Sequence, residues 1–152
     1  MSVLGIRCST NDFAYAVVDG SIACPDLIDA GAIPCPANYS QPEKLKWFLD
    51  ELSTLNGKHN IDRWAIKGAE PMAAKGKPYA ARVEMEAMVS LSAANTGMDS
   101  VVRKVKPTIA KDLGLKGRAK ALTEDLDYSL INDLDQKSDK EFEAIVVAWS
   151  CL

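Results

Sequence analysis

The sequence lacks the features that would place it in a membrane, on a secretion route or around a structural zinc ion. No apolar run approaches the roughly 18 residues that a membrane span needs, and the clean run from Ala144 to Trp149 is far shorter. The first residues, MSVLGIRC, contain no long apolar stretch followed by small residues, so we see no secretion signal and expect a cytoplasmic protein. The single histidine, His59, and four irregularly spaced cysteines offer no zinc ligand set.

Motifs for nucleotide phosphates and for thiol chemistry are missing as well. The loop from Gly114 to Arg118 lacks the G-x-x-x-x-G-K-[ST] spacing of a phosphate-binding loop. There is no C-x-x-C pair, and His59 sits in a polar segment without a visible orienting partner, which disfavours a Cys–His nucleophile. We therefore expect free thiols, with Cys8 and Cys151 as small core residues.

The composition is that of an ordinary globular domain. Hydrophobic residues make up 47% and charged residues 26% of 152 residues, which excludes a disordered chain. A chain of this length buries enough surface to build its own core. We predict one domain over residues 1–152.

Charge is distributed in two opposed blocks, although the net charge is only −3. Seven basic residues and one acid between Arg103 and Lys120 give a local charge of +6. Two bases and eight acids between Thr123 and Glu143 give −6. The two blocks either neutralise each other in the fold, or the basic block forms a patch for phosphate groups, and the sequence leaves both readings open.

The N-terminal third predicts three antiparallel strands. Ser2–Cys8 is a short apolar run, and Phe13–Asp19 is rich in aromatic and β-branched residues. The polar turn Ser9–Asp12 between them predicts a hairpin. Leu27–Ile33 is a weaker third strand.

The middle of the chain alternates helices and strands. A capping box at Ser40–Glu43 begins a helix that we expect to end at Asn56-Gly57, and Ile61–Lys67 follows as a strand. A second helix covers about Tyr79–Asn95. The stripe that we expect to face the sheet consists of Val83, Ala87, Ser90, Leu91 and Ala94.

The last third predicts a strand over Ser100–Val105 and a short helix within Pro107–Ala121. No element is assigned to the acidic segment Thr123–Asp133. A second capping box, Ser138–Glu141, begins a terminal helix. The order β-β-β-α-β-α-β-(α)-α indicates an α/β domain with a mixed sheet and helices packed on its faces.

This order resembles that of the ribonuclease H-like superfamily, and several stretches resemble its RuvC-type Holliday-junction resolvases. The stretches are Val3–Ile6, Tyr15–Val18, Trp64–Lys67, the Ala-rich helix from Tyr79, Val105–Pro107 with Gly114–Lys120, and Glu143–Ala148. The resemblance implies a five-stranded mixed sheet, with three antiparallel N-terminal strands followed by βαβαβ and helices on both faces. It also implies phosphodiester hydrolysis by two Mg²⁺ ions held by carboxylates on the first strand, the fourth strand and the last helix.

Most of the family's acidic positions carry bases in this sequence. Arg7 follows the Gly-Ile pair of the first strand, and Lys67 follows the Ala-Ile pair of the fourth. The two positions three apart on the last helix are Lys140 and Glu143. Because a divalent cation is repelled by neighbouring guanidinium and ammonium groups, this pattern argues against the family's metal-dependent mechanism.

Two interpretations of the altered site remain. In the first, Arg7 pairs with Glu143 within a salt-bridged cluster that only holds the sheet to the last helix. In the second, the same cleft binds a phosphate or a nucleic-acid backbone without cutting it. We assign no catalytic residue, no metal ligand and no cofactor. The candidate cleft comprises Arg7, Lys67, Glu70, Lys140 and Glu143, widened by Arg103, Lys106, Lys116 and Arg118.

The alternative function is a divergent Mg²⁺-dependent nuclease whose carboxylates have moved. Glu70 is its best candidate ligand, and Asp12, Asp19 and Glu141 are the others. A rebuilt site would require three of these groups to converge in space. Under the preferred reading the chain is a module that binds nucleic acid or protein, and a second copy of the chain is a further expected partner.

Overall fold

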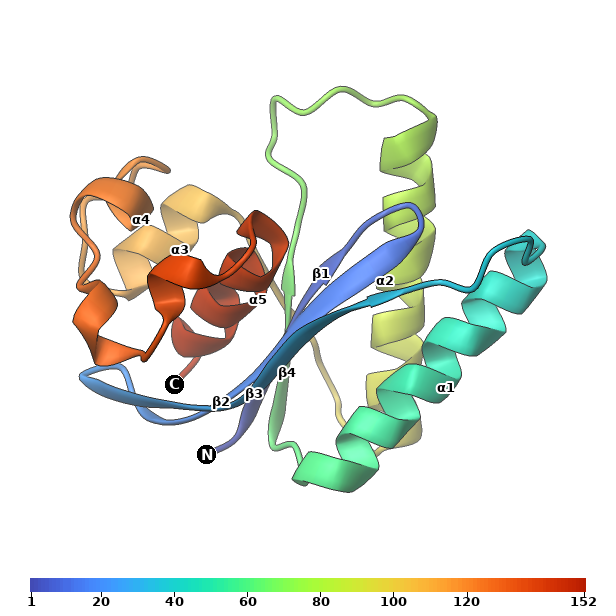
Figure 1. Cartoon of the computed structure of the whole chain (residues 1–152), viewed down its shortest axis with the longest axis horizontal. Helices are drawn as coiled ribbons and strands as arrows, with labels where there is room; N and C mark the ends of the chain where they lie inside the picture. The colour runs from blue at the N-terminus through green and yellow to red at the C-terminus, as the bar shows by residue number, and fades with distance from the viewer.

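A five-stranded mixed sheet forms the centre of the computed structural model, which describes all residues from 1 to 152 (Figure 1). The strand order is β3-β2-β1-β4-β5. The first three strands are antiparallel, and β4 and β5 run parallel to β1. The strands are β1 (Val3–Cys8), β2 (Asp12–Ser21), β3 (Cys24–Pro34), β4 (Arg63–Lys67) and β5 (Val102–Lys104).

Helices cover both faces of this sheet. In Figure 1, α1 (Gln41–His59) and α2 (Lys77–Asn95) lie on one side, and α5 (Asp139–Trp149) lies on the other with α3 (Lys106–Asp112) and α4 (Ala121–Glu124) beside it. Short 3₁₀ turns, η1 (Tyr128–Leu130) and η2 (Leu134–Gln136), precede α5. None of the helices has the length and apolar character that crossing a membrane requires.

Local signals explain where most elements begin and end. The hairpin turn is closed by the Ser9 amide, which donates to the Asp12 carbonyl at 3.0 Å. Both predicted capping boxes are formed, with Ser40 and Glu43 at α1 and with Ser138 and Glu141 at α5. The predicted strands are present, although β3 is longer and β5 shorter than the sequence indicated.

The two faces of the sheet bury separate cores because strand side chains alternate. Leu4 and Ile6 of β1 pack with Phe48 of α1 and Met85 of α2. Val3 of β1 belongs to the other core, with the residues of α5. Cys8 and Cys151 are buried, as predicted, and so are Trp64 and Trp149.

Close contact between β1 and α5 depends on small residues. A Cβ at Gly5 would collide with the carbonyl oxygen of Ala144 and would crowd the side chain of Ala148. The absent side chain therefore lets the helix lie directly on the strand. This contact brings the first turn of α5 next to the carboxyl end of β1.

Two predictions about the helices are wrong. Helix α1 continues through Asn56 and Gly57 to His59. Asn60 caps it, because its backbone is left-handed (φ 51°) and its amide donates a hydrogen bond to the Asn56 carbonyl. Helix α2 does not turn the predicted small-residue stripe inward, and Val83 and Leu91 are 41% and 45% exposed. Its buried residues are Met85, Glu86, Val89, Ser92 and Ala93, because Met85 and Val89 pack into the core that Phe48 and Leu52 of α1 form with the sheet.

The two edges of the sheet differ in length. β5 pairs with β4 over only three residues. β3 pairs with β2 along its length and has Pro25 and Pro34 near its ends, with the exposed Asp26 between them. The register of the β2–β3 pair shifts at Val17 and Val18.

Candidate functional site

Arg7 and Lys67 stand side by side at the carboxyl ends of β1 and β4. The parallel register aligns Gly5 with Ala65 and Ile6 with Ile66, so the next residues on both strands are neighbours. Alternation along each strand turns both side chains toward the face covered by α5. The chain thus places two cations where adjacent parallel strands end.

Glu143, in the first half of α5, is held by Arg7 and by a further cation, Lys106. Its Oε2 accepts from Arg7 Nε at 2.6 Å, and its Oε1 lies 3.2 Å from Lys106 Nζ. Burial alone would raise the pKa of Glu143, but Lys67, Arg7 and Lys106 together lower the pKa below its ordinary value. Glu143 is therefore a charged carboxylate whose two oxygens are both engaged.

Lys67 forms the second ion pair and is almost completely enclosed. Its Nζ lies 2.8 Å from Glu70 Oε1 and donates to the Gly68 carbonyl at 2.6 Å, with 2% of the side chain exposed. Burial lowers the pKa of Lys67, against the opposing effects of Glu70 and Glu143. Glu70 Oε1 also accepts from the Lys106 amide at 3.1 Å, so this carboxylate ties the loop after β4 to the start of α3.

Arg82 and Glu86 of α2 complete the cluster, and sequence reasoning missed both. Arg82 Nη2 donates to the Lys67 carbonyl at 2.6 Å, and its Nε lies 3.3 Å from Glu86 Oε1. Glu86 is 1% exposed and also pairs with Arg103 of β5. Arg82, Glu86 and Val89 are spaced so that they share one face of the helix, and this spacing could have indicated the buried face of α2. The prediction instead followed the stripe with more apolar residues.

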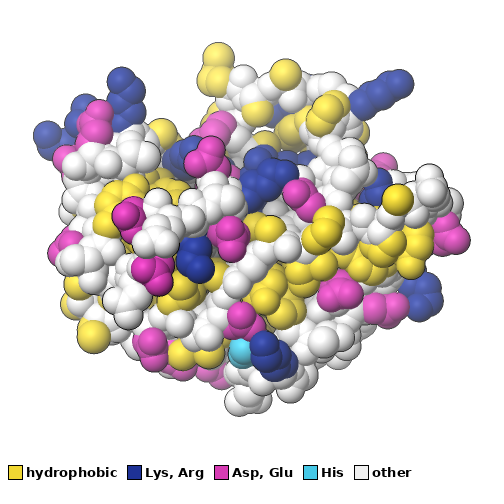
Figure 2. All heavy atoms as spheres, in the orientation of Figure 1, with side chains coloured by type: hydrophobic (Ala, Val, Ile, Leu, Met, Phe, Trp, Pro, Cys, Tyr) yellow, Lys and Arg dark blue, Asp and Glu magenta, His cyan; other side chains and the backbone are white.

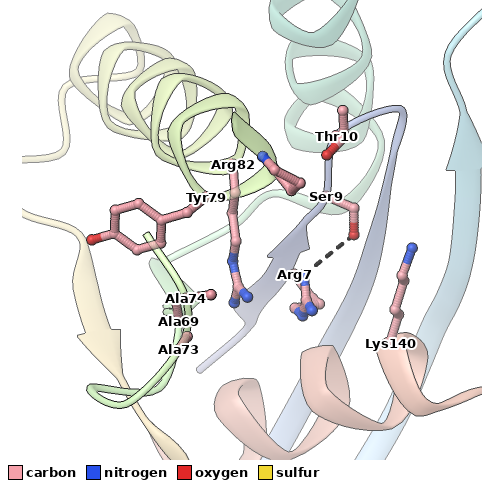
Figure 3. A pocket seen from close by; sticks show the side chains of 10 residues that line it. Arg7, Ser9, Thr10, Ala69, Ala73, Ala74, Tyr79, Arg82 and Lys140 are labelled. Atoms are coloured by element: carbon pink, nitrogen blue, oxygen red, sulfur yellow. Dashed lines mark hydrogen bonds between the residues drawn. The ribbon is translucent and has the colours of Figure 1, made fainter. Parts of the chain in front are cut away.

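A cavity of about 320 Å³ opens beside these residues, at the carboxyl ends of β1 and β4. Its charged lining residues are Arg7, Arg82 and Lys140, and Figure 3 shows the guanidinium groups of the two arginines turned toward the same space. In the space-filling view, basic side chains gather in a hollow between the α3–α5 side and the loop that precedes α2, with acidic side chains at its rim (Figure 2). The other lining residues are Ser9, Thr10, Ala69, Ala73, Ala74, Pro78 and Tyr79.

Some predicted residues do not join the cluster. Lys140 does not pair with Glu70 or Glu143; its Nζ lies 2.9 Å from Asp12 Oδ1 at the rim of the cavity. Arg118, in the loop after α3, pairs with Glu124 of α4 and not with a residue at the strand ends. Lys116 is an exposed residue of the same loop.

The basic block is consequently neutralised in part within its own half of the chain. Lys104 pairs with Asp112 at 2.8 Å and donates to the Ser150 carbonyl at 2.7 Å. Together with the pairs formed by Arg103, Lys106 and Arg118, four of its seven bases have acidic partners. The remaining exposed bases of the block lie on α3 and in the loop that follows.

The interlocked ion pairs around the strand ends are called the strand-end cluster below. They comprise five cations and three carboxylates, which leaves an excess of two positive charges. The cations are Arg7, Lys67, Arg82, Arg103 and Lys106, and the carboxylates are Glu70, Glu86 and Glu143.

The residues at the strand ends do not fit a divalent cation. No three acidic, histidine or cysteine side chains come together anywhere in the chain. The carboxylates named as replacements are engaged separately: Glu70 with Lys67, Asp12 with Lys140, Asp19 with the N-terminal amine, and Glu141 in its capping box. A hard cation needs several free anionic oxygens at one point, and the strand-end cluster offers cations there instead.

Comparisons with known proteins bear on the fold. No family model and no curated protein matches the sequence. The structure is similar to RuvC from Thermus thermophilus bound to a Holliday junction substrate, with a TM-score of 0.73, 12% identity, and coverage of 99% of this chain and 91% of that chain. A second Thermus thermophilus RuvC structure gives a TM-score of 0.75 at 12% identity, covering 99% and 92%.

The yeast mitochondrial Holliday junction resolvase is a third similar structure. Its TM-score is 0.61 at 13% identity, and the match covers 97% of this chain and 77% of that chain. At these identities the likeness concerns the fold alone. The expected fold is confirmed: the chain has the ribonuclease H-like fold, in the arrangement found in RuvC-type resolvases.

Proposed function

We propose that this chain is a nucleic-acid-binding module that holds backbone phosphate at the strand-end cluster and does not hydrolyse it with metal ions. The observation that carries the proposal is the placement of Arg7 and Lys67 side by side, with Glu143 engaged by Arg7 and Lys106. The similarity to RuvC bound to a junction substrate supports nucleic acid as the partner class.

Charge at the strand ends favours an anion over a cation. The strand-end cluster has two more cations than carboxylates, and the Lys140–Asp12 pair at the rim of the cavity leaves this excess unchanged. In a partly enclosed site such an excess is only weakly screened by water and salt. A phosphate group compensates it, whereas Mg²⁺ would increase it.

The individual residues have different roles in this proposal. Arg7 and Lys140 line the cavity and can reach a phosphate oxygen directly. Lys67 is too enclosed for contact, so it acts by adding charge and by fixing Glu70. Glu143 orients Arg7 rather than binding a metal ion. The exposed base Lys116 would extend the surface along which a backbone runs, whereas the charge of Arg118 is balanced by Glu124.

The test is binding of labelled single-stranded, duplex and four-way-junction DNA, measured by fluorescence anisotropy over a range of salt concentrations. We expect binding at low salt that weakens steeply as salt increases, because each phosphate contact releases counterions. Lys140→Gln should weaken binding, and the matched variant Lys46→Gln, which removes an exposed charge on α1, should not. Absence of binding to all three DNAs at low salt would refute the proposal.

The same DNAs test the alternative nuclease. We expect no strand cleavage when Mg²⁺ or Mn²⁺ is added to the purified protein. Divalent-ion-dependent cleavage that disappears in Glu70→Gln or Glu143→Gln would establish the alternative, since contaminating nucleases would be indifferent to these variants.

Three broader expectations stay predictions. They are a single domain over residues 1–152, a cytoplasmic location and a homodimer. Sedimentation equilibrium would measure the oligomeric state, and limited proteolysis would show whether the chain is cleaved as one unit.

A further inference from the structure

We propose that the cavity at the strand ends takes a terminal phosphate monoester, so that the module binds an end of a nucleic acid rather than only its internal backbone. This inference rests on the proposed function and names the part of the nucleic acid that the site recognises. It is carried by the geometry of two arginines, by the charge excess around them and by the shape of the cavity.

Arg7 and Arg82 form a like-charged pair with unused donors. Their side chains come from β1 and α2 and are only 18% and 13% exposed, yet both guanidinium groups face the cavity (Figure 3). Arg7 bonds Glu143 through Nε, and the Cys8 carbonyl and Ser9 hydroxyl through Nη1, which leaves Nη2 without a protein acceptor. Arg82 uses Nε and Nη2, which leaves Nη1 free.

This proximity is unfavourable in the protein alone. Burial lowers the pKa of Arg82, and the charge of Arg7 lowers it further. An anion between the two guanidinium groups would remove the repulsion and satisfy the free N–H groups. Planar guanidinium groups bind phosphate oxygens in pairs, so two arginines are well suited to a group with several terminal oxygens.

The size of the charge excess distinguishes a monoester from a diester. The strand-end cluster carries two more positive than negative charges. An internal phosphodiester carries one negative charge, whereas a terminal phosphate carries between about 1.5 and 2 at neutral pH. The terminal group therefore comes closer to neutralising the cluster.

The shape of the cavity points the same way. One wall is apolar and contains Ala69, Ala73 and Ala74, while Ser9 and Thr10 contribute hydroxyl groups on another side (Figure 3). A phosphate in mid-strand has chain on both sides, so it can meet the arginines only from the mouth of the cavity. A terminal phosphate has three free oxygens and one substituent, so it can enter with its sugar against the apolar wall. The volume of about 320 Å³ is at the lower end of that of small-molecule sites.

The test compares otherwise identical single-stranded oligonucleotides that carry a 5′-phosphate, a 3′-phosphate or only hydroxyl ends, each labelled internally. We expect at least one phosphorylated end to bind about tenfold more tightly than the hydroxyl-ended strand, since charge-assisted hydrogen bonds are gained. Arg82→Lys keeps the positive charge but loses the paired N–H donors of the guanidinium group, and should reduce this preference. Lys46→Gln, with one charge removed at a distance, should keep it.

Circular dichroism melting shows whether each variant folds. If Arg82→Lys does not fold, Ser9→Ala serves as a second variant of the cavity lining. Equal affinity for all three oligonucleotides overturns the inference but leaves the proposed function standing. Failure of every oligonucleotide to bind overturns both. Inorganic phosphate and a mononucleotide form a separate arm, and binding of these without any oligonucleotide would assign the cavity to a small phosphate ester and overturn the inference.

Discussion

Arg7 Nε on the first strand donates to Glu143 Oε2 on the last helix at 2.6 Å, across 136 positions of sequence. The two side chains are 18% and 13% exposed, so this ion pair lies largely within the protein. It joins the start of the chain to its end at the point where β1 and β4 finish. Both partners therefore act on stability as well as on the charge of the cleft.

Breaking this pair should destabilise the fold. We expect Arg7→Gln to lower the free energy of unfolding by about 1–3 kcal/mol, less than for a fully buried pair because water still reaches both groups. Urea denaturation of Arg7→Gln, Glu143→Gln and the double variant forms a cycle that isolates the coupling between them. Strictly additive effects would show that the pair contributes nothing as a pair. Lys46→Gln in the exposed Lys46–Asp50 pair should leave stability nearly unchanged.

Gly5 and Gly57 should respond in opposite ways to the same substitution. Gly5→Ala forces a Cβ against α5, and overpacking of this kind should cost about 1–3 kcal/mol. Gly57→Ala lies within α1 where a Cβ meets nothing within 4 Å, so it should stabilise the protein by up to about 1 kcal/mol. Thermal melting measures both. A neutral Gly5→Ala would mean that α5 can move away from β1 without loss.

Acid should weaken the protein partly through Glu143. Its pKa is lowered in the folded state, so the ionised group stabilises the fold above its ordinary pKa, and this contribution is lost as pH falls through the lowered value. Unfolding midpoints in urea from neutral to acidic pH should therefore decline less steeply in Glu143→Gln. Glu51→Gln, at a partly exposed position of α1, is the matched variant and should follow the unmodified protein. Identical acid profiles for all three proteins would contradict this assignment.

Magnesium should not stabilise the unmodified chain. A ligand that binds the folded state raises the melting temperature, but Arg7 and Lys67 repel a divalent cation from the strand ends. We expect no change in melting temperature with millimolar Mg²⁺ or Mn²⁺. Arg7→Asp with Lys67→Asp places carboxylates on adjacent strand ends beside Glu143, and this double variant should gain metal-dependent stabilisation. A metal-induced shift in the unmodified protein that Glu143→Gln abolishes would show that a metal site exists.

Elements with local signals could be predicted from the sequence. The capping boxes at Ser40 and Ser138 and the hairpin at Ser9–Asp12 depend on neighbouring residues, and each is present as expected. The buried face of α2 was predicted wrongly because an Ala-rich helix has weak amphipathic patterning. Which side faces inward is then decided by where Met85 and Val89 find space between the sheet and α1.

Only part of the candidate site could be predicted from the sequence. The pairing of Arg7 with Glu143 could be predicted because the family resemblance puts both residues at one site, where an arginine attracts a carboxylate. Lys140 takes Asp12 instead, because it lies one turn earlier on α5 and faces the hairpin. Arg82 arrives at the same cleft from a helix on the opposite face of the sheet, and no local pattern reports how far α2 reaches beyond β4.

The edges of the sheet have a consequence for association in solution. The outer strand β3 is a poor template for a further strand, because Pro25 and Pro34 lack an amide donor and the exposed acid Asp26 repels the same strand of an incoming copy. The register shift at Val17 and Val18 marks an irregularity in the pairing of β3, and β5 offers only three residues on the other edge. Growth into fibrils by edge-to-edge addition is thereby opposed at both margins, and self-association would have to use helix or loop surfaces.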